Sequence, residues 1–140
     1  VNISLAVSVE EGLFVPVIRD ADKKGILQIA SDRHELVEKA RQSKLIPDDY
    51  IGGSVTLSNL GMFDVNSFLP IINTPESCIV GVGTISDRVV AWQGGIHVRP
   101  MMTATLSGDH RATDGAVAAM LLKDFKSLLE APEKIAGGIA

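Results

Sequence analysis

The densest cluster of polar side chains is the run Ser107-Gly108-Asp109-His110-Arg111-Ala112-Thr113-Asp114-Gly115. It stands between an alternating segment typical of a strand and a periodic segment typical of a helix. A turn in that position can hold a side chain firmly and still leave it reachable. His110 is the candidate general base, because an imidazole titrates close to neutral pH. The structural alternative makes His110 one member of a turn held by the charges of Asp109 and Arg111.

Asp114 and Ser58 each have a structural and a functional interpretation. Asp114 precedes the last predicted helix, and aspartate is a favoured N-cap, so its position alone favours a capping role. That role is compatible with a place in the site. Ser58 ends a short alternating segment, where a serine commonly bonds its own backbone. We expect no metal site, because His110 and Asp114 have no third ligand nearby in the sequence.

The remaining histidines and the single cysteine are expected to be structural. His34 falls on the charged side of a predicted helix, and His97 on the polar face of a predicted hairpin. Cys78 lies in an apolar run and is expected to be a small core residue. One cysteine cannot form a disulfide within the chain.

Strands dominate the elements that must position these residues. Residues 1–9 alternate as one half-buried strand, and Pro16 makes residues 13–18 an edge or irregular strand. Residues 78–82 are continuously apolar, as in a central strand. Other strands are expected at 54–58, 88–92, 96–99 and 101–107, with a hairpin around residues 93–95.

Two helices are expected beside the strands. Ser31 should cap the first, which ends before Pro47. The second covers about residues 115–129. The connection 62–75 is too apolar for a solvated linker and should pack, and the tail 131–140 should fray. The strand content and mixed order predict an α+β fold with a mixed β-sheet and flanking helices.

Composition excludes several classes of function. The chain has 140 residues, enough for one domain, with 46% hydrophobic and 21% charged residues. A net charge of −4 without a basic stripe argues against nucleic-acid binding. The longest apolar run, residues 116–122, is far shorter than the ~20 residues of a membrane-spanning helix. No secretory signal peptide is expected from the opening residues.

Four segments resemble one enzyme family. Asp109-His110-Arg111 with Asp114-Gly115 resembles the DHRxxDG signature of the dihydrolipoamide acyltransferases, the E2 components of 2-oxoacid dehydrogenase complexes. Residues 52–63 are similar to the family's GGxFTISNLGMF segment, residues 12–22 to GLxxPVIRDAD, and residues 71–76 to IINPPE. The resemblance spans nearly all of residues 1–140 and corresponds to the larger C-terminal part of the catalytic domain, with a chloramphenicol acetyltransferase-like fold.

The resemblance implies transfer of an acyl group between a dihydrolipoyl thiol and coenzyme A. The SNLGMF pattern is more similar to pyruvate-type enzymes, which favours acetyl. A thiol with a pKa of ~8.5 is mostly protonated at neutral pH, so His110 would take its proton as the sulfur attacks. Ser58 would donate a hydrogen bond to the oxyanion of the tetrahedral intermediate. Asp114 would hold the loop and the imidazole.

Other site residues would support the turn. The resemblance implies that Asp109 and Arg111 fix the loop through ion pairs, and that Gly115 lets the backbone turn tightly into the helix. Gly108 stands where bulkier residues are common, and Ala112-Thr113 replaces a pair of branched apolar residues, so the channel near His110 should differ in shape.

The resemblance also implies partners. Coenzyme A would be a substrate, the lipoyl group would come from a separate domain, and no cofactor would be bound covalently. Family members form homotrimers, and larger cores, in which the histidine of one subunit faces the serine of the next. The tail 135–140 is less apolar than an anchoring C-terminus. Other partners would be the lipoyl domain, E1 and E3, in a bacterial cytoplasm, a mitochondrial matrix or a plastid, without nucleic acid or membrane.

Other functions remain open at this point. One is a non-catalytic oligomeric core or scaffold of a 2-oxoacid dehydrogenase complex. Another is a different coenzyme A-dependent acyltransferase of the same fold, acting on a small alcohol or amine. A Ser-His-Asp hydrolase is disfavoured, because Ser58 lacks the Gly-x-Ser-x-Gly context of a nucleophile elbow.

Overall fold

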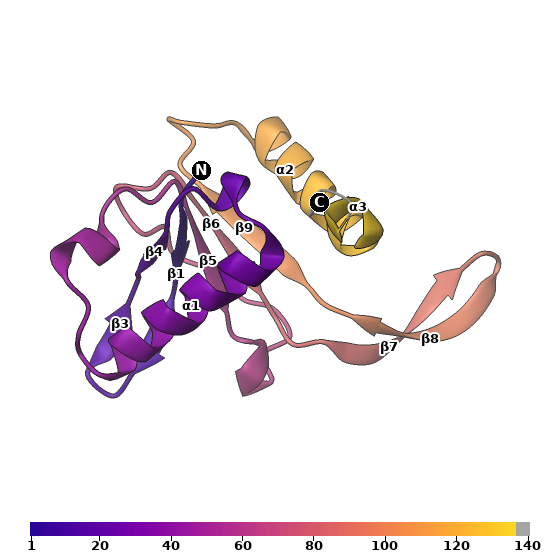
Figure 1. Cartoon of the computed structure of the whole chain (residues 1–140). Coiled ribbons are helices and arrows are strands. Elements are labelled where there is room, and N and C mark those ends of the chain that lie inside the picture. Colours follow the sequence, from indigo (N-terminus) through magenta and orange to yellow (C-terminus); the bar gives the residue numbers. More distant parts are fainter. Residues whose placement is uncertain (137–140) are drawn as a thin grey trace.

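The computed structural model describes residues 1–136 and is built on a five-stranded mixed sheet (Figure 1). Its strand order is β4-β1-β5-β6-β9. The three inner strands run parallel, whereas both edge strands are antiparallel to their neighbours. The five strands are β1 (Ile3–Leu5), β4 (Val17–Ile18), β5 (Val55–Asn59), β6 (Cys78–Val82) and β9 (Ala104–Gly108). The predicted α+β class with a mixed sheet is confirmed.

Strand β6 occupies the position that its apolar sequence predicts. It lies between β5 and β9, and four of its five residues are buried. Residues Ile79, Val80 and Val82 of β6 belong to the hydrophobic core. Burial on both faces explains why this strand shows no polar alternation.

The expected single strand over residues 1–9 is wrong. The chain changes partner at Ala6, so that β1 belongs to the large sheet while β2 (Val7–Val9) pairs with β3 (Gly12–Phe14). The predicted strand 13–18 is divided in the same way, around Pro16, which has no N–H to donate. Alternation continues through the break at Ala6, and the run 13–18 is apolar on both sides of Pro16, so the sequence pattern reveals neither change of partner. Strand β4 does lie at a sheet edge, as Pro16 predicted.

The predicted start of the first helix is also wrong. Helix α1 (Ile26–Arg41) begins after Gly25, and Ser31 lies inside it. Asp32 therefore sits in the second turn, where its carboxylate accepts hydrogen bonds from Lys24 Nζ at 2.6 Å and Gln28 Nε2 at 2.7 Å. The first turn of α1 exposes Leu27, and no side chain caps it. The sequence therefore carries neither a capping residue nor a buried apolar position that would mark the start of this helix.

The second long helix and the hairpin agree with prediction. Helix α2 (Gly115–Leu129) has the expected bounds and contacts β9. Strands β7 (Ser86–Trp92) and β8 (Gly95–Met101) form a hairpin that projects away from the large sheet (Figure 1). Its turn is Gln93-Gly94, both with positive φ, so Gly95 already belongs to a strand. Positive φ at both positions matches the right-handed twist of a hairpin.

The tail 131–140 and the connection 62–75 agree only in part with the predictions made from the sequence. The tail forms a short helix, α3 (Glu133–Ala136), where fraying was expected, and residues 137–140 lie outside the described part of the chain. In the connection, Pro70 is buried and Phe68 is half-buried, whereas Met62, Phe63, Leu69 and Ile71 are exposed. Three short 3-10 helices complete the chain: η1 (Ala21–Lys23), η2 (Pro47–Tyr50) and η3 (Gly61–Phe63).

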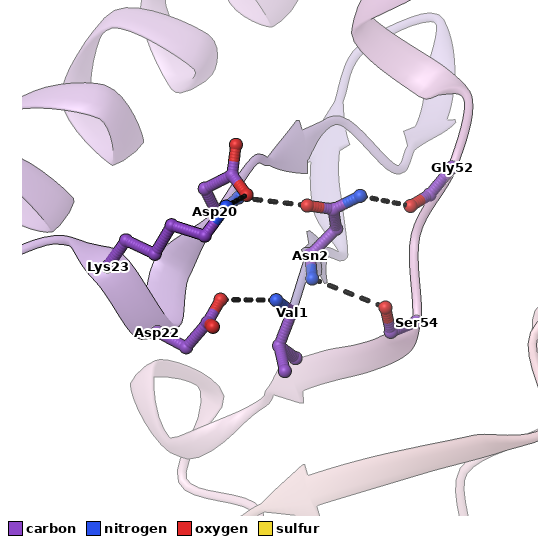
Figure 2. Close-up of polar contacts among 7 residues, drawn as sticks. All are labelled: Val1, Asn2, Asp20, Asp22, Lys23, Gly52 and Ser54. Atoms are coloured by element: carbon purple, nitrogen blue, oxygen red, sulfur yellow. Dashed lines mark hydrogen bonds and ion pairs between the residues drawn. The ribbon is translucent and has the colours of Figure 1, made fainter.

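Asn2 joins three segments at one end of the sheet (Figure 2). Its side-chain oxygen accepts a bond from the Asp20 backbone N–H at 2.8 Å, and its Nδ2 donates to the Gly52 carbonyl at 2.6 Å. Its backbone N–H donates to Ser54 Oγ at 3.2 Å. Asn2 thus aligns the start of β1 with the segment that leads into β5, the strand that carries Ser58.

Candidate active site

A turn built around the Asp109 backbone carries His110. Strand β9 ends at Gly108, and the Asp109 N–H donates to the Ser77 carbonyl at 2.8 Å. The Asp109 carbonyl then accepts the N–H groups of Ala112 at 2.9 Å and Thr113 at 3.1 Å. His110 is exposed in this turn. Its backbone position is therefore held, while its imidazole is open to a reactant.

The predicted ion pair of the turn is confirmed. Arg111 Nη2 lies 2.6 Å from Asp109 Oδ2, and Arg111 Nε lies 3.0 Å from Asp109 Oδ1. The Arg111 backbone N–H adds a bond to Oδ1 at 2.9 Å. These bonds lower the pKa of Asp109 to about 2 and raise that of Arg111. Asp109 is thus a fixed charge at neutral pH, unsuited to proton transfer.

Asp114 caps α2 as its position predicted. Its Oδ1 accepts the backbone N–H groups of Ala116 and Val117, both at 2.9 Å. These are two of the N–H groups that the first turn of a helix leaves without intrahelical partners. Within residues 1–136 no hydrogen bond joins Asp114 to His110, so the observed role of this carboxylate is to fix the start of α2.

The expected glycine-dependent turn at position 115 finds no support in this geometry. Gly115 is the first residue of α2, its φ is not positive, and a Cβ built there would meet no atom within 4 Å. Gly108 is the tighter position, since its Cβ would lie 3.2 Å from Thr113 Cγ2.

Ser58 lies near the end of β5 with a free hydroxyl. It is half-buried, and no residue of the described chain forms a hydrogen bond with its Oγ, so the backbone bond of its structural interpretation is not seen. Its register partner on β6 is Gly81. A Cβ on Gly81 would lie 2.8 Å from Phe68 Cζ, so the Phe68 ring covers β6 beside Ser58. Thr105 Oγ1 fastens this segment by donating to the Phe68 carbonyl at 2.6 Å.

Ser58 and His110 do not meet within one chain. Ser58 is level with Gly81 and Thr105, whereas β9 leaves the sheet three residues later, at Gly108. Three residues along a strand and two strand spacings across the sheet place the Ser58 and Gly108 Cα atoms about 14 Å apart. His110 lies beyond Gly108, past the opposite end of the sheet from Ser58.

Sequence reasoning missed a buried polar cluster at the same sheet. Glu76 accepts hydrogen bonds from Ser4 Oγ and from Thr56 Oγ1, both at 2.5 Å. All three residues are buried. They are widely separated in the sequence, so only the pairing of β1 with β5 brings them together. The one available signal was a glutamate without a neighbouring cation, in the segment that precedes the apolar β6.

The other candidates stay outside the site. Burial, with a smaller contribution from the Glu76 charge, raises the pKa of the Cys78 thiol, which disfavours a nucleophilic thiolate. His34 and His97 are exposed, and His97 lies edge-on to Trp92, with ring centroids 5.7 Å apart.

Over residues 1–136, no three His, Cys, Asp or Glu side chains group as metal ligands. No helix in that range is long and apolar enough to cross a membrane.

The sequence has close curated relatives. It is 47% identical over 132 residues to the dihydrolipoyllysine-residue acetyltransferase component of the pyruvate dehydrogenase complex of Rickettsia bellii, a match that covers 94% of this chain and 32% of the relative. It is 45% identical to component 2 of the mitochondrial enzyme of Arabidopsis thaliana, covering 96% of this chain and 26% of the relative. The chain thus spans about a third or less of these proteins.

Solved structures share the fold over nearly all of the chain. One comes from a study of a serine, a histidine and an asparagine in the catalytic mechanism of Azotobacter vinelandii dihydrolipoamide acetyltransferase. Another is the cubic core of a pyruvate dehydrogenase multienzyme complex. Each has a TM-score of 0.92 and 42% identity, covering 97% of this chain and 56% of the solved one.

A family model described as 2-oxoacid dehydrogenases acyltransferase (catalytic domain) matches residues 1–136. That match covers almost the whole sequence and includes the turn of His110 and the strand of Ser58. The chain belongs to the 2-oxoacid dehydrogenase acyltransferase family, within its catalytic domain.

Proposed function

We propose that this chain is the larger C-terminal part of a catalytic domain that transfers an acetyl group between coenzyme A and a dihydrolipoyl group. One observation carries the proposal. Ser58, His110 and Asp114 have the same spacings along the chain as the serine, histidine and asparagine named for the Azotobacter vinelandii enzyme. Aspartate stands here where that enzyme has asparagine, and both residue types can cap a helix.

His110 acts as the general base in this proposal. Its imidazole takes the proton of the attacking thiol as the sulfur bonds to the carbonyl carbon of the thioester. The carbonyl oxygen becomes an oxyanion, and the free hydroxyl of Ser58 donates a hydrogen bond to it. The carbon–sulfur bond of the original thioester then breaks, and the departing sulfur takes the proton back from the imidazolium. Both thiols are bound together, so no acyl-enzyme forms.

The site requires two copies of the chain. Ser58 and His110 lie at opposite ends of one sheet, so the base of one copy must meet the oxyanion donor of another. A closed ring of three copies meets this need, since it repeats one heterologous contact. The exposed apolar face of α2 supports such packing: Val117, Met120, Leu121, Leu128 and Leu129. We extend the proposal to a larger core, as in the solved cubic assembly.

The remaining partners follow from the same family. Coenzyme A and the lipoyl group would bind as substrates, the lipoyl group on a separate domain, and the E1 and E3 components would act before and after the transfer. The relatives are bacterial and mitochondrial proteins. Their sources support a place in a bacterial cytoplasm or a mitochondrial matrix.

Acetyl transfer from acetyl-CoA to free dihydrolipoamide tests the mechanism. We expect His110→Ala to lose roughly a hundredfold or more of the rate, and Ser58→Ala a similar factor through the lost oxyanion donor. His34→Ala, which changes an exposed histidine on α1, is the control. Equal rates for His110→Ala and the unaltered protein would refute the general base.

Mixing the two inactive variants tests the shared site. When Ser58→Ala and His110→Ala chains are unfolded together and reassembled in equal amounts, about a quarter of the interfaces pair an intact serine with an intact histidine. About a quarter of the activity should therefore return. A site within one chain would recover nothing.

A second candidate function is an assembled core that does not catalyse transfer. The apolar surface of α2 and of the projecting hairpin favours it, because this surface suits assembly with or without chemistry. A native mass above that of one chain, with no transfer by the unaltered protein, would favour this candidate. Transfer to a small alcohol or amine but not to dihydrolipoamide would instead indicate another acyltransferase of the same fold.

A further inference from the structure

Among the described residues 1–136, the buried carboxylate of Glu76 has hydroxyl partners but no cation. Glu76 is 9% exposed, and its carboxylate accepts one hydrogen bond on each oxygen, from Ser4 and from Thr56. A carboxylate has about four lone-pair sites, so half of its capacity remains. Among residues 1–136 no lysine, arginine or histidine forms an ion pair with it. A buried charge of this kind is costly unless an opposite charge reaches it.

Glu76 lines a cavity of about 460 Å³ that opens to the surface. Two aromatic rings of its wall, Phe14 and Tyr50, have centroids 6.1 Å apart. Leu13 and Ile51 also line it and are 66% and 61% exposed. The cavity therefore combines a desolvated negative charge, aromatic surface and an apolar rim.

The backbone keeps the carboxylate in place. A Cβ on Gly53 would lie 2.2 Å from Glu76 Oε1 and 2.0 Å from Ser4 Oγ, so no other residue fits position 53 without moving the cluster. Arg19 Nη1 lies beside Gly52, but the Nη2 of the same guanidinium group donates to the Asp48 carbonyl at 2.6 Å. The cluster is thus fixed around a carboxylate to which no cation of the described part of the chain donates.

We propose that this cavity binds the guanidinium or ammonium group of a basic side chain on a polypeptide segment that lies across Leu13 and Ile51. The carboxylate would accept charge-assisted hydrogen bonds, and the rings of Phe14 and Tyr50 would add cation–π attraction. The site is independent of acyl transfer, since it uses neither Ser58 nor His110.

Two observations favour a polypeptide over a free cation. The exposed apolar rim offers contacts that a small cation cannot use, whereas a segment with apolar residues beside the basic one covers it. The solved relatives also contain much polypeptide with no counterpart here, since this chain covers 56% of each. A segment of that kind would bury Leu13 and Ile51 together with the charge of Glu76.

Peptide binding tests the charge requirement. The probes are two fluorescein-labelled peptides, Leu-Arg-Leu and Leu-citrulline-Leu, with blocked ends, measured by fluorescence anisotropy on the protein in its native assembly. Citrulline keeps the shape of arginine without its charge. We expect the arginine peptide to bind roughly tenfold or more tightly. Equal affinities would overturn the proposal.

Competition distinguishes the two sources of the cation. n-Butylguanidinium should displace the arginine peptide only at concentrations at least tenfold above those of the unlabelled peptide, because it lacks the rim contacts. The uncharged n-butylurea should not displace it. If n-butylguanidinium competes as well as the peptide, the site takes free cations and the assignment to a polypeptide is wrong.

Variants locate the binding. Glu76→Gln keeps the size and one acceptor but removes the charge, so it should abolish the preference for arginine over citrulline. Ile51→Ser and Leu13→Ser change only exposed side chains and should weaken the arginine peptide while folding is retained. Val89→Ser, on the exposed hairpin, is the matched control. Weakening by Val89→Ser to the same extent as by Ile51→Ser would place the peptide elsewhere and refute the site.

Discussion

At the scale of single residues, the turn of His110 depends on charges that do not titrate near neutral pH. The Asp109 carboxylate accepts hydrogen bonds from the guanidinium group and from the backbone N–H of Arg111, and it forms an ion pair with that guanidinium. These contacts lower the pKa of the Asp109 carboxyl to about 2. A fixed anion beside the base orients the loop without competing for the proton of the substrate. This arrangement separates the group that shapes the turn from the group proposed to react.

The Asp109–Arg111 pair has a defined pH dependence. A depressed carboxyl pKa stabilises the folded state above its unfolded value, near 3.9, and this contribution is lost as the pH falls through about 2. Arg111→Gln should return the pKa of Asp109 toward 3.9. NMR titration of the Asp109 carboxyl checks the shift. An unchanged pKa in the variant would show that Arg111 is not its cause.

Variants of Asp114 test whether this residue stabilises α2 through the hydrogen bonds of its side chain. Asp114→Ala removes the acceptor for two N–H groups and should cost about 1 kcal/mol of unfolding free energy. Asp114→Asn should cost far less, because asparagine caps equally well. Urea unfolding of both variants measures the difference. If both lose the same stability, the charge at the helix start matters more than the hydrogen bonds.

At the scale of elements, sequence patterns succeeded where the signal is local. Asp114 and the apolar spacing that follows it predicted α2 with its observed bounds, and the run 78–82 predicted the central strand. The start of α1 was missed, because Gly25 caps it without a side-chain bond and Leu27 points to solvent.

Features that depend on the pairing of strands far apart in the sequence could not be predicted from local sequence patterns. The change of sheet at Ala6 leaves the alternation of residues 1–9 intact, so periodicity alone cannot detect it. Glu76 meets Ser4 and Thr56 only because β1 lies beside β5. The separation of Ser58 from His110 likewise follows from the strand order, which no local pattern encodes.

Two glycines should respond oppositely to alanine. A Cβ on Gly83 would lie 2.2 Å from the Asn66 backbone oxygen, so Gly83→Ala should destabilise the fold by about 1–3 kcal/mol. A Cβ on Gly115 would meet no atom within 4 Å, so Gly115→Ala should stabilise the fold by roughly 0.4–1 kcal/mol by restricting the unfolded chain. Thermal unfolding of the separate chain distinguishes them. A strongly destabilised Gly115→Ala chain would contradict the open space beside this residue.

At the scale of the whole molecule, α2 and the β7–β8 hairpin expose apolar side chains that another copy of the chain could cover. Several large apolar side chains of α2 and of the β7–β8 hairpin are exposed, whereas four of the five residues of the inner strand β6 are buried. We expect Leu121→Ser to lower the assembled mass in native mass spectrometry without lowering the stability of a single chain, since Leu121 is exposed there. An unchanged mass would place the interface on another face.

The parallel pairing of β1 with β5 also sets the order in which the chain folds. Ile3 pairs with Val55, and the hairpin residue Val89 pairs with Val98 only nine positions later. Closing a long loop costs more entropy than forming a hairpin, so β7–β8 and α1 should form first and the sheet last. In pulse-labelled hydrogen exchange during refolding, amides of β7 should gain protection before those of β5. The strand that carries Ser58 would then be among the last parts of the chain to become ordered, and newly made chains would be unable to assemble a working site until this slow step is complete.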